Sequence, residues 1–217
     1  MHIEFIDLLR CPRPHEESWL IAAFNIMDGR MVIEGKLGCP VCSAEYPIRA
    51  GVADFGMSVD AGQECALDEG EIATTGRSIQ SDEDVMRLAA MLGLSRPGML
   101  VLLTGTTAQS SHRLAALVTG RVITVNAPRH ATGDSEAVGS IRIGGVFPIA
   151  SHSVDGIALD ASQTSLALLT EVSRVLKPGG RLTAPSSVSL PGGLHELARD
   201  DSHVVAESMG QLVALGR

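Results

Sequence analysis

The chain has 217 residues, of which 45% are apolar and 19% are charged, so we expect a globular core and exclude wholesale disorder. The net charge is −8, and residues 1–79 carry six Lys or Arg against thirteen Asp or Glu. Because the sequence lacks a basic stripe and has only 3% aromatic residues to stack on bases, we expect no direct nucleic-acid partner.

The sequence also carries no signal for membrane insertion or export. It has no run of about 18 apolar residues, so no membrane-spanning segment is expected. The start, "MHIEFIDLLRCPRP", lacks the basic and apolar regions of a secretory signal. These observations predict a cytoplasmic protein, which would reach a cytoplasmic membrane face only through a partner.

Residues 1–55 are predicted to form a small β-rich domain. Apolar side chains at positions 5, 6, 8 and 9 indicate a short helical turn at its start. Two strand-like runs, 19–26 and 30–36, flank Asp28-Gly29, which is a strong hairpin signal. The stretch "YPIRAGVADF" (46–55) is interpreted as a third strand, after a tight turn at "CPVC" (39–42).

This domain holds a candidate metal site. The CxxC turn of Cys39 and Cys42 presents two thiolates to one ion. Cys11 could supply a third ligand and His15 a fourth, because proline occupies the second thiol position of the other turn. We leave two alternatives open: one structural zinc ion on a Cys3His site, or a metal-free ribbon held by apolar contacts. A thioredoxin-type redox pair fits poorly without a βαβ unit, and Cys65 is interpreted as an ordinary thiol.

The motifs "LLRCP" (8–12), "CPVC" (39–42) and "YPIRAGV" (46–52) together resemble a known family. It is the family of small zinc ribbons that act as obligate partners of tRNA and protein methyltransferases, and the resemblance covers residues 3–55. It implies a structural zinc ion. Ribbons of this family shield an apolar surface of the methyltransferase by strand addition, which in this chain would become an internal contact.

The remaining sequence is predicted to be an acidic linker (56–80) and an α/β domain (81–217). A stop signal, Lys177-Pro178-Gly179-Gly180, follows the last predicted helix. The tail (203–217) is interpreted as a terminal antiparallel hairpin. Helices are expected at 82–94, 110–120 and 165–176, and strands at 99–104, 121–126, 140–145, 153–160 and 181–187.

The stretches "FPIASHSVDGIALD" (147–160) and "EVSRVLKPGGRL" (171–182) are similar to the later half of class I S-adenosylmethionine-dependent methyltransferases. This resemblance covers residues 81–217 and implies a Rossmann-like, methyltransferase-type sheet covered by helices. In that family a glycine-rich turn after the first strand admits the cofactor. A carboxylate after the second strand binds the ribose, and a polar group after the third lies beside the adenine.

The chain departs from this pattern at each cofactor position. Gly105 is the only glycine of its turn, Asn126 stands at the ribose position, and "GGVFPI" (144–149) carries no acid. An ionised acceptor contact contributes about 1.5–3 kcal/mol, so we expect S-adenosylmethionine to bind only at millimolar levels or more weakly. Asp155 is expected to stabilise the turn before its strand, and Asp160 to be a solvated acid. We assign no catalytic and no cofactor-binding residue.

These features predict a non-catalytic pseudoenzyme, in which a methyltransferase-derived fold fused to a ribbon serves as a protein-binding or scaffold subunit of a larger complex. Two alternatives remain. One is a divergent S-adenosylmethionine-dependent methyltransferase, and the other is an activator partner of a separate methyltransferase.

Overall fold

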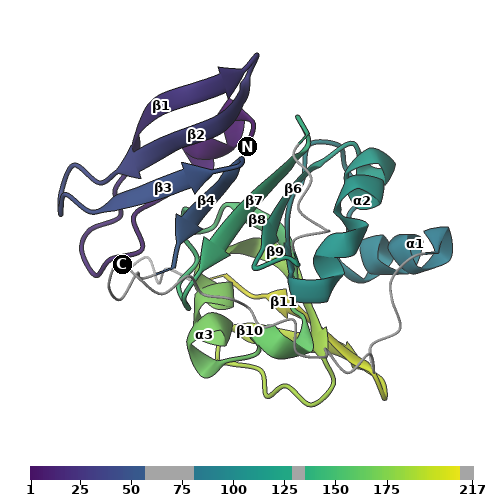
Figure 1. Ribbon diagram of the computed structural model, residues 1–217. Coiled ribbons are helices and arrows are strands. Elements are labelled where there is room, and N and C mark those ends of the chain that lie inside the picture. Colours follow the sequence, from purple (N-terminus) through teal and green to yellow (C-terminus); the bar gives the residue numbers. More distant parts are fainter. Residues whose placement is uncertain (57–80, 129–134, 211–217) are drawn as a thin grey trace, which may run out of the picture.

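A single mixed sheet of eleven strands runs through the protein (Figure 1). The computed structural model describes residues 1–56, 81–128 and 135–210, so Cys65 and nearly all of the predicted linker lie outside the described residues. The strand order is β1-β2-β3-β4-β7-β6-β5-β8-β9-β11-β10. The six central strands, from β4 to β9, are parallel, and the pairs at both ends of the sheet are antiparallel.

Residues 1–55, called the ribbon below, form one antiparallel end of the sheet. The hairpin predicted at Asp28-Gly29 is confirmed, with Gly29 in the left-handed region (φ 56°). The single strand predicted over 46–55 is wrong, because the chain reverses at Ala50 (φ 47°) and Gly51 (φ 79°). Alanine rarely adopts a positive φ, so its presence at position 50 does not indicate a turn. The elements are η1 (Ile3–Leu8), β1 (Ile21–Asp28), β2 (Met31–Gly38), β3 (Glu45–Arg49) and β4 (Val52–Phe55).

Strand β4 joins the ribbon to the rest of the sheet. It pairs in parallel with β7 (Val138–Ile143), with Ala53 opposite Ile141 and Phe55 opposite Ile143. The internal strand addition expected from the ribbon resemblance is therefore confirmed.

Residues 81–210 form the α/β part. Numbered from β5, its strands run 3-2-1-4-5-7-6 across the sheet, which contains the order of a doubly wound Rossmann-like fold. The predicted α/β class is confirmed, although only three α-helices occur in the described residues. The elements are α1 (Asp82–Met91), β5 (Leu100–Thr104), η2 (Gly105–Ser110), α2 (Ser111–Val118), β6 (Arg121–Val125), β7, β8 (Val154–Ala158), η4 (Ala161–Gln163), α3 (Leu166–Val175), β9 (Leu176–Pro185), β10 (Leu194–Arg199) and β11 (His203–Ser208).

Two details of this part differ from the prediction. Helix α3 ends at Val175 as expected, but Lys177–Gly180 forms a bulge inside β9, because Leu176 pairs with Val154 and Arg181 with Gly156. The first half of the predicted terminal hairpin is β11, which pairs with β10 and β9. Positions 211–217 lie outside the described residues.

Apolar side chains cover both faces of the sheet. Helices α1 and α2 pack on one face, and α3 packs on the other (Figure 1). The N-terminal segment covers part of the α3 face, where the buried Phe5 ring lies against Gly139 of β7, so closely that a Cβ there would be 3.0 Å from the ring. None of the helices in the described ranges has the length and apolar character to cross a bilayer.

Hydrogen bonds fasten the N-terminal segment to the loop between β7 and β8. The Arg10 N–H donates to the Pro148 carbonyl (2.9 Å), and the Ala150 N–H donates to the Leu8 carbonyl (3.2 Å). The Arg174 guanidinium of α3 donates to the carbonyls of Phe147 (2.7 Å) and Ile149 (2.8 Å). Together with the β4–β7 pairing, these contacts make the ribbon and the α/β part share one core.

The shared core predicts how the protein unfolds. Replacing Phe5 with Ala should lower the free energy of unfolding by about 3–5 kcal/mol, because it leaves a cavity between η1 and β7. Chemical denaturation, followed by circular dichroism, should show one transition in both proteins, and Phe5→Leu should lose less stability. Two transitions would contradict the shared core and support separate domains at 1–55 and 81–217.

Candidate functional site

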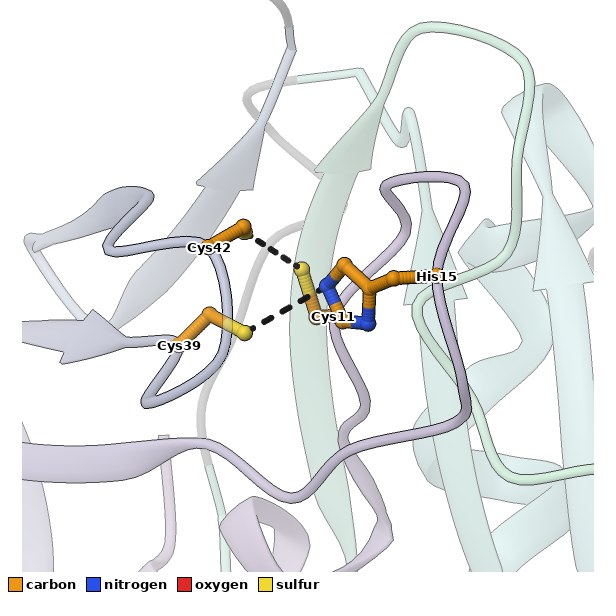
Figure 2. A group of neighbouring side chains, drawn as sticks. All are labelled: Cys11, His15, Cys39 and Cys42. Atoms are coloured by element: carbon orange, nitrogen blue, oxygen red, sulfur yellow. Dashed lines mark hydrogen bonds between the residues drawn. The ribbon is translucent and has the colours of Figure 1, made fainter.

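The four predicted metal ligands lie together on the ribbon (Figure 2). Cys11 follows η1, His15 lies in the loop after it, and Cys39 and Cys42 flank the turn between β2 and β3. All four ligand atoms lie within 4.8 Å of one another. The distance from Cys11 Sγ to Cys42 Sγ is 3.7 Å, and that from Cys39 Sγ to His15 Nε2 is 3.4 Å.

The distances of these two donor pairs match those in a tetrahedral zinc site. Ligands about 2.3 Å (sulfur) and 2.0 Å (nitrogen) from a central ion lie about 3.8 Å apart for two sulfurs and about 3.5 Å apart for sulfur and nitrogen. The donor set, three thiols and one imidazole, is one that zinc takes in closed structural sites. The residues present therefore fit the ion that the sequence suggested, and the cluster could hold a metal.

The turn and the loop orient the donors. The Cys39–Cys42 turn is closed by the Ser43 N–H, which donates to the Cys39 carbonyl (2.9 Å), with Ser43 in the left-handed region (φ 57°). His15 Nδ1 lies 2.6 Å from the carbonyl of Glu16. Since a carbonyl only accepts, Nδ1 carries the proton there, and Nε2 keeps a lone pair toward the thiols.

The cluster favours one thiolate before any metal binds. Burial raises the pKa of Cys39, but backbone N–H groups of Cys42 and Val41 outweigh it and lower that pKa from 9.0 to about 6. Burial raises the pKa of Cys11, whose Sγ lies 3.3 Å from the Tyr46 hydroxyl. The hydrogen bond to the Glu16 carbonyl is the main cause that raises the pKa of His15.

A second candidate region is the carboxyl edge of the parallel strands, where ligands of doubly wound folds bind at the switch point between the first and fourth strands, here β5 and β8. Asp160 follows β8, and its side chain reaches the turn that follows β5. Its carboxylate accepts four hydrogen bonds. Two come from the backbone N–H and the hydroxyl of Thr106, and two from the backbone N–H and the hydroxyl of Ser162. These hydrogen bonds lower its pKa against the effect of burial, so it is ionised at neutral pH.

The Asp160 side chain also lies directly against Gly105. It has a positive φ (53°), and a Cβ at this position would lie 2.8 Å from Asp160 Cβ. The acid expected at Asp160 is partly exposed, and it is hydrogen-bonded to the loops on both sides of the switch point. The Asp160 side chain contacts the glycine turn, and Thr106 belongs to no sequence motif that indicates this contact.

Asn126, at the end of β6, is also committed to contacts within the chain. Its Nδ2 donates to the carbonyl of Ile143 (3.1 Å) and to Gln163 Oε1 (2.9 Å), while its Oδ1 accepts from the Ile143 N–H (2.9 Å). The side chain thus ties the ends of β6 and β7 to η4, with its own backbone in the left-handed region (φ 50°).

Asp155 has a different role from the one expected. It is buried inside β8, and its Oδ2 accepts from the Leu100 N–H (2.9 Å) and from Lys177 Nζ (2.8 Å). It therefore links the starts of β5 and β9, and does not stabilise a turn.

No family model matches the sequence, and no curated protein matches it. Solved structures with a similar arrangement include a geranyl diphosphate methyltransferase (18% identity, TM-score 0.41, covering 47% of this chain and 43% of that one). A sarcosine dimethylglycine methyltransferase of Galdieria sulphuraria, described as putative, has 22% identity and a TM-score of 0.40, covering 48% of this chain and 45% of that one. The [4+2]-cyclase SpnF has 16% identity and a TM-score of 0.44, covering 57% and 62%.

The chain thus spans less than two thirds of each of these proteins, and their activities are statements about them alone. The resemblance of residues 3–55 to the activator ribbons stays a prediction.

Zinc content tests the cluster. The purified protein should contain one zinc ion per chain by mass spectrometry of metals, because the four donors converge at zinc distances. Cys39→Ser should lose the ion and lower the melting temperature, since binding free energy of a structural zinc contributes to folding. Cys65→Ser should keep the zinc ion and leave the melting temperature unchanged. A wild-type chain that takes up no zinc would instead support the metal-free ribbon.

The lowered pKa of Cys39 gives a pH dependence in the metal-free protein. Its thiolate is stabilised in the folded state, so that contribution is complete above the unfolded pKa and is lost as the pH falls from 9.0 to about 6. Ultraviolet absorbance should show one thiol ionising near pH 6, and Cys39→Ser should remove that step. Ionisation of all the thiols near their ordinary pKa would contradict this assignment.

Proposed function

We propose that the protein is a non-catalytic, methyltransferase-derived scaffold subunit, with a zinc-stabilised ribbon built into its sheet. Its partners would be proteins of a larger assembly in the cytoplasm, with membrane contact only through such a partner. The observation that carries the proposal is the position of Asp160, which is hydrogen-bonded across the switch point and contacts Gly105.

The closure of the switch point is argued from the contacts of Asp160. An ionised carboxylate with four donors is held where it lies by hydrogen bonds to the loops on both sides of the switch point. A cofactor entering above Gly105 would have to displace this side chain and leave the donors of Thr106 unpaired. Its binding free energy would be reduced by that cost.

The ribose position supports the same conclusion. Asn126 offers no charge to a ribose, and the described hydrogen bonds of its side chain go to Ile143 and Gln163. Loss of one ionised acceptor contact together with the cost of moving Asp160 would weaken a micromolar site to about millimolar or beyond.

The joint between ribbon and sheet disfavours the activator alternative. Strand β4 is already paired with β7 of its own chain, so a separate methyltransferase would have to pair with the outer strand β1 instead. The outer strand β1 is one free edge of the sheet, and Ile21 on it and Trp19 beside it are 65% and 62% exposed. Exposed apolar groups on an edge strand are typical of surfaces that bind other proteins.

Calorimetric titration with S-adenosylmethionine and S-adenosylhomocysteine tests the non-catalytic part. We expect no heat of binding up to about millimolar ligand, and no shift in melting temperature. Asn126→Asp should not create binding, and should lower the free energy of unfolding by about 1–3 kcal/mol, because its carboxylate cannot donate to Ile143 and Gln163.

Binding of either ligand at micromolar levels would instead support the divergent methyltransferase. Binding by Asn126→Asp alone would show that the turn above Gly105 is open and would contradict the closure argument. The scaffold part is tested by native purification, from which the protein should elute with a stoichiometric protein partner. Elution as a lone monomer would count against it.

A further inference from the structure

A small polar cavity lies at the opposite edge of the sheet from Gly105. It has a volume of about 160 Å³ and is formed by the end of α1, the starts of β5 and β8, and the bulge of β9. Three cationic side chains, Arg96, Lys177 and Arg181, line it together with a single acid, Asp155. In a chain with a net charge of −8, this is a local excess of positive charge.

The cations have hydrogen-bond donors to spare. Arg96 is exposed and makes no hydrogen bond or ion pair within the described residues. Arg181 has one ion pair, from Nε to Glu207 Oε2 at 3.5 Å, and its side chain makes no hydrogen bond there. Lys177 Nζ donates to Asp155, which leaves two of its three protons unused. The cavity is therefore rich in donors.

The backbone around the cavity does not supply the missing acceptors. The last carbonyls of α1 are capped, because the N–H groups of Gly93 and Leu94 donate to Ala90 (3.0 Å) and Ala89 (3.0 Å). Asp155 is buried and already accepts from Leu100 and Lys177 through the same oxygen. Gly179, in the left-handed region (φ 76°), has nothing within 4 Å of its Cβ position, so a ligand can approach the bulge closely.

We propose that this cavity binds a phosphoryl group, either as inorganic phosphate or as the phosphomonoester end of a small molecule. A tetrahedral dianion brings several acceptor oxygens to two guanidinium groups and one ammonium group, and arginine pairs with it through two parallel hydrogen bonds. The cavity volume suits a group of this size, and its open side leaves room for the rest of an ester. The site lies away from the switch point, so it does not depend on the proposed loss of cofactor binding.

Titration followed by amide chemical shifts tests the site, with inorganic phosphate as the probe at constant ionic strength. We expect saturable shifts at Gly93, Gly179 and Gly180, with a dissociation constant of about 1 mM. Arg96→Gln should weaken binding about tenfold, because it removes a charge-assisted pair. Arg49→Gln is the matched control, since it removes the same charge from an exposed position on the ribbon and should leave binding unchanged.

Three results would overturn the proposal. These are shifts that do not saturate, equal loss of phosphate affinity in Arg96→Gln and Arg49→Gln, or acetate binding as tightly as phosphate. Because Arg96 is exposed, its substitution should not unfold the protein, and Arg181→Gln provides a second test from the other side of the cavity. Glycerol 3-phosphate separates the two sources of the group. Tighter binding than phosphate indicates a phosphorylated small molecule, and weaker binding indicates the free ion.

Discussion

The parallel pairing of β4 with β7 is the contact on which the rest of the architecture depends. It requires the chain to reverse at Ala50-Gly51, so that β4 runs in the direction of the central strands. Once β4 is in place, the N-terminal segment lies on the α3 face, Phe5 covers Gly139, and Arg174 reaches the loop beside Arg10. The ribbon is consequently part of the core, and its loss would expose the apolar side of β7.

The same joint explains why a metal ion would matter far from its ligands. Cys11 follows the segment that covers the sheet, and Cys39 and Cys42 hold the turn that feeds β3. An ion bridging these two parts of the chain would fix the N-terminal segment against the hairpin. The free energy of metal binding would thereby stabilise the shared core as well as the turn itself.

Two edges of the α/β sheet have opposite character. At the carboxyl edge, the Asp160 and Asn126 side chains are hydrogen-bonded to neighbouring loops of the same chain. At the amino edge, the bulge of β9 brings Lys177 and Arg181 beside Arg96, and two acids, Asp155 and Glu207, pair with only part of their donors. Unused donors therefore collect on the side of the sheet that the fold does not ordinarily use for binding.

The sequence by itself determined the α/β class, the Asp28-Gly29 hairpin, most strand and helix positions and the residues of the Cys/His cluster. These depend on local signals: side-chain periodicity, turn residues and ligand spacing. It could not determine the reversal at Ala50 or the pairing of β11 with β10. Nor could it determine the hydrogen bonds between Asp160 and Thr106 and between Asp155 and Leu100. The two turns are local, but alanine at position 50 does not indicate a turn, whereas Asp160 and Asp155 meet partners more than 50 residues away, which only tertiary packing decides. The amino-edge cavity has the same origin, because Arg96 and Arg181 become neighbours only when α1 packs against β9.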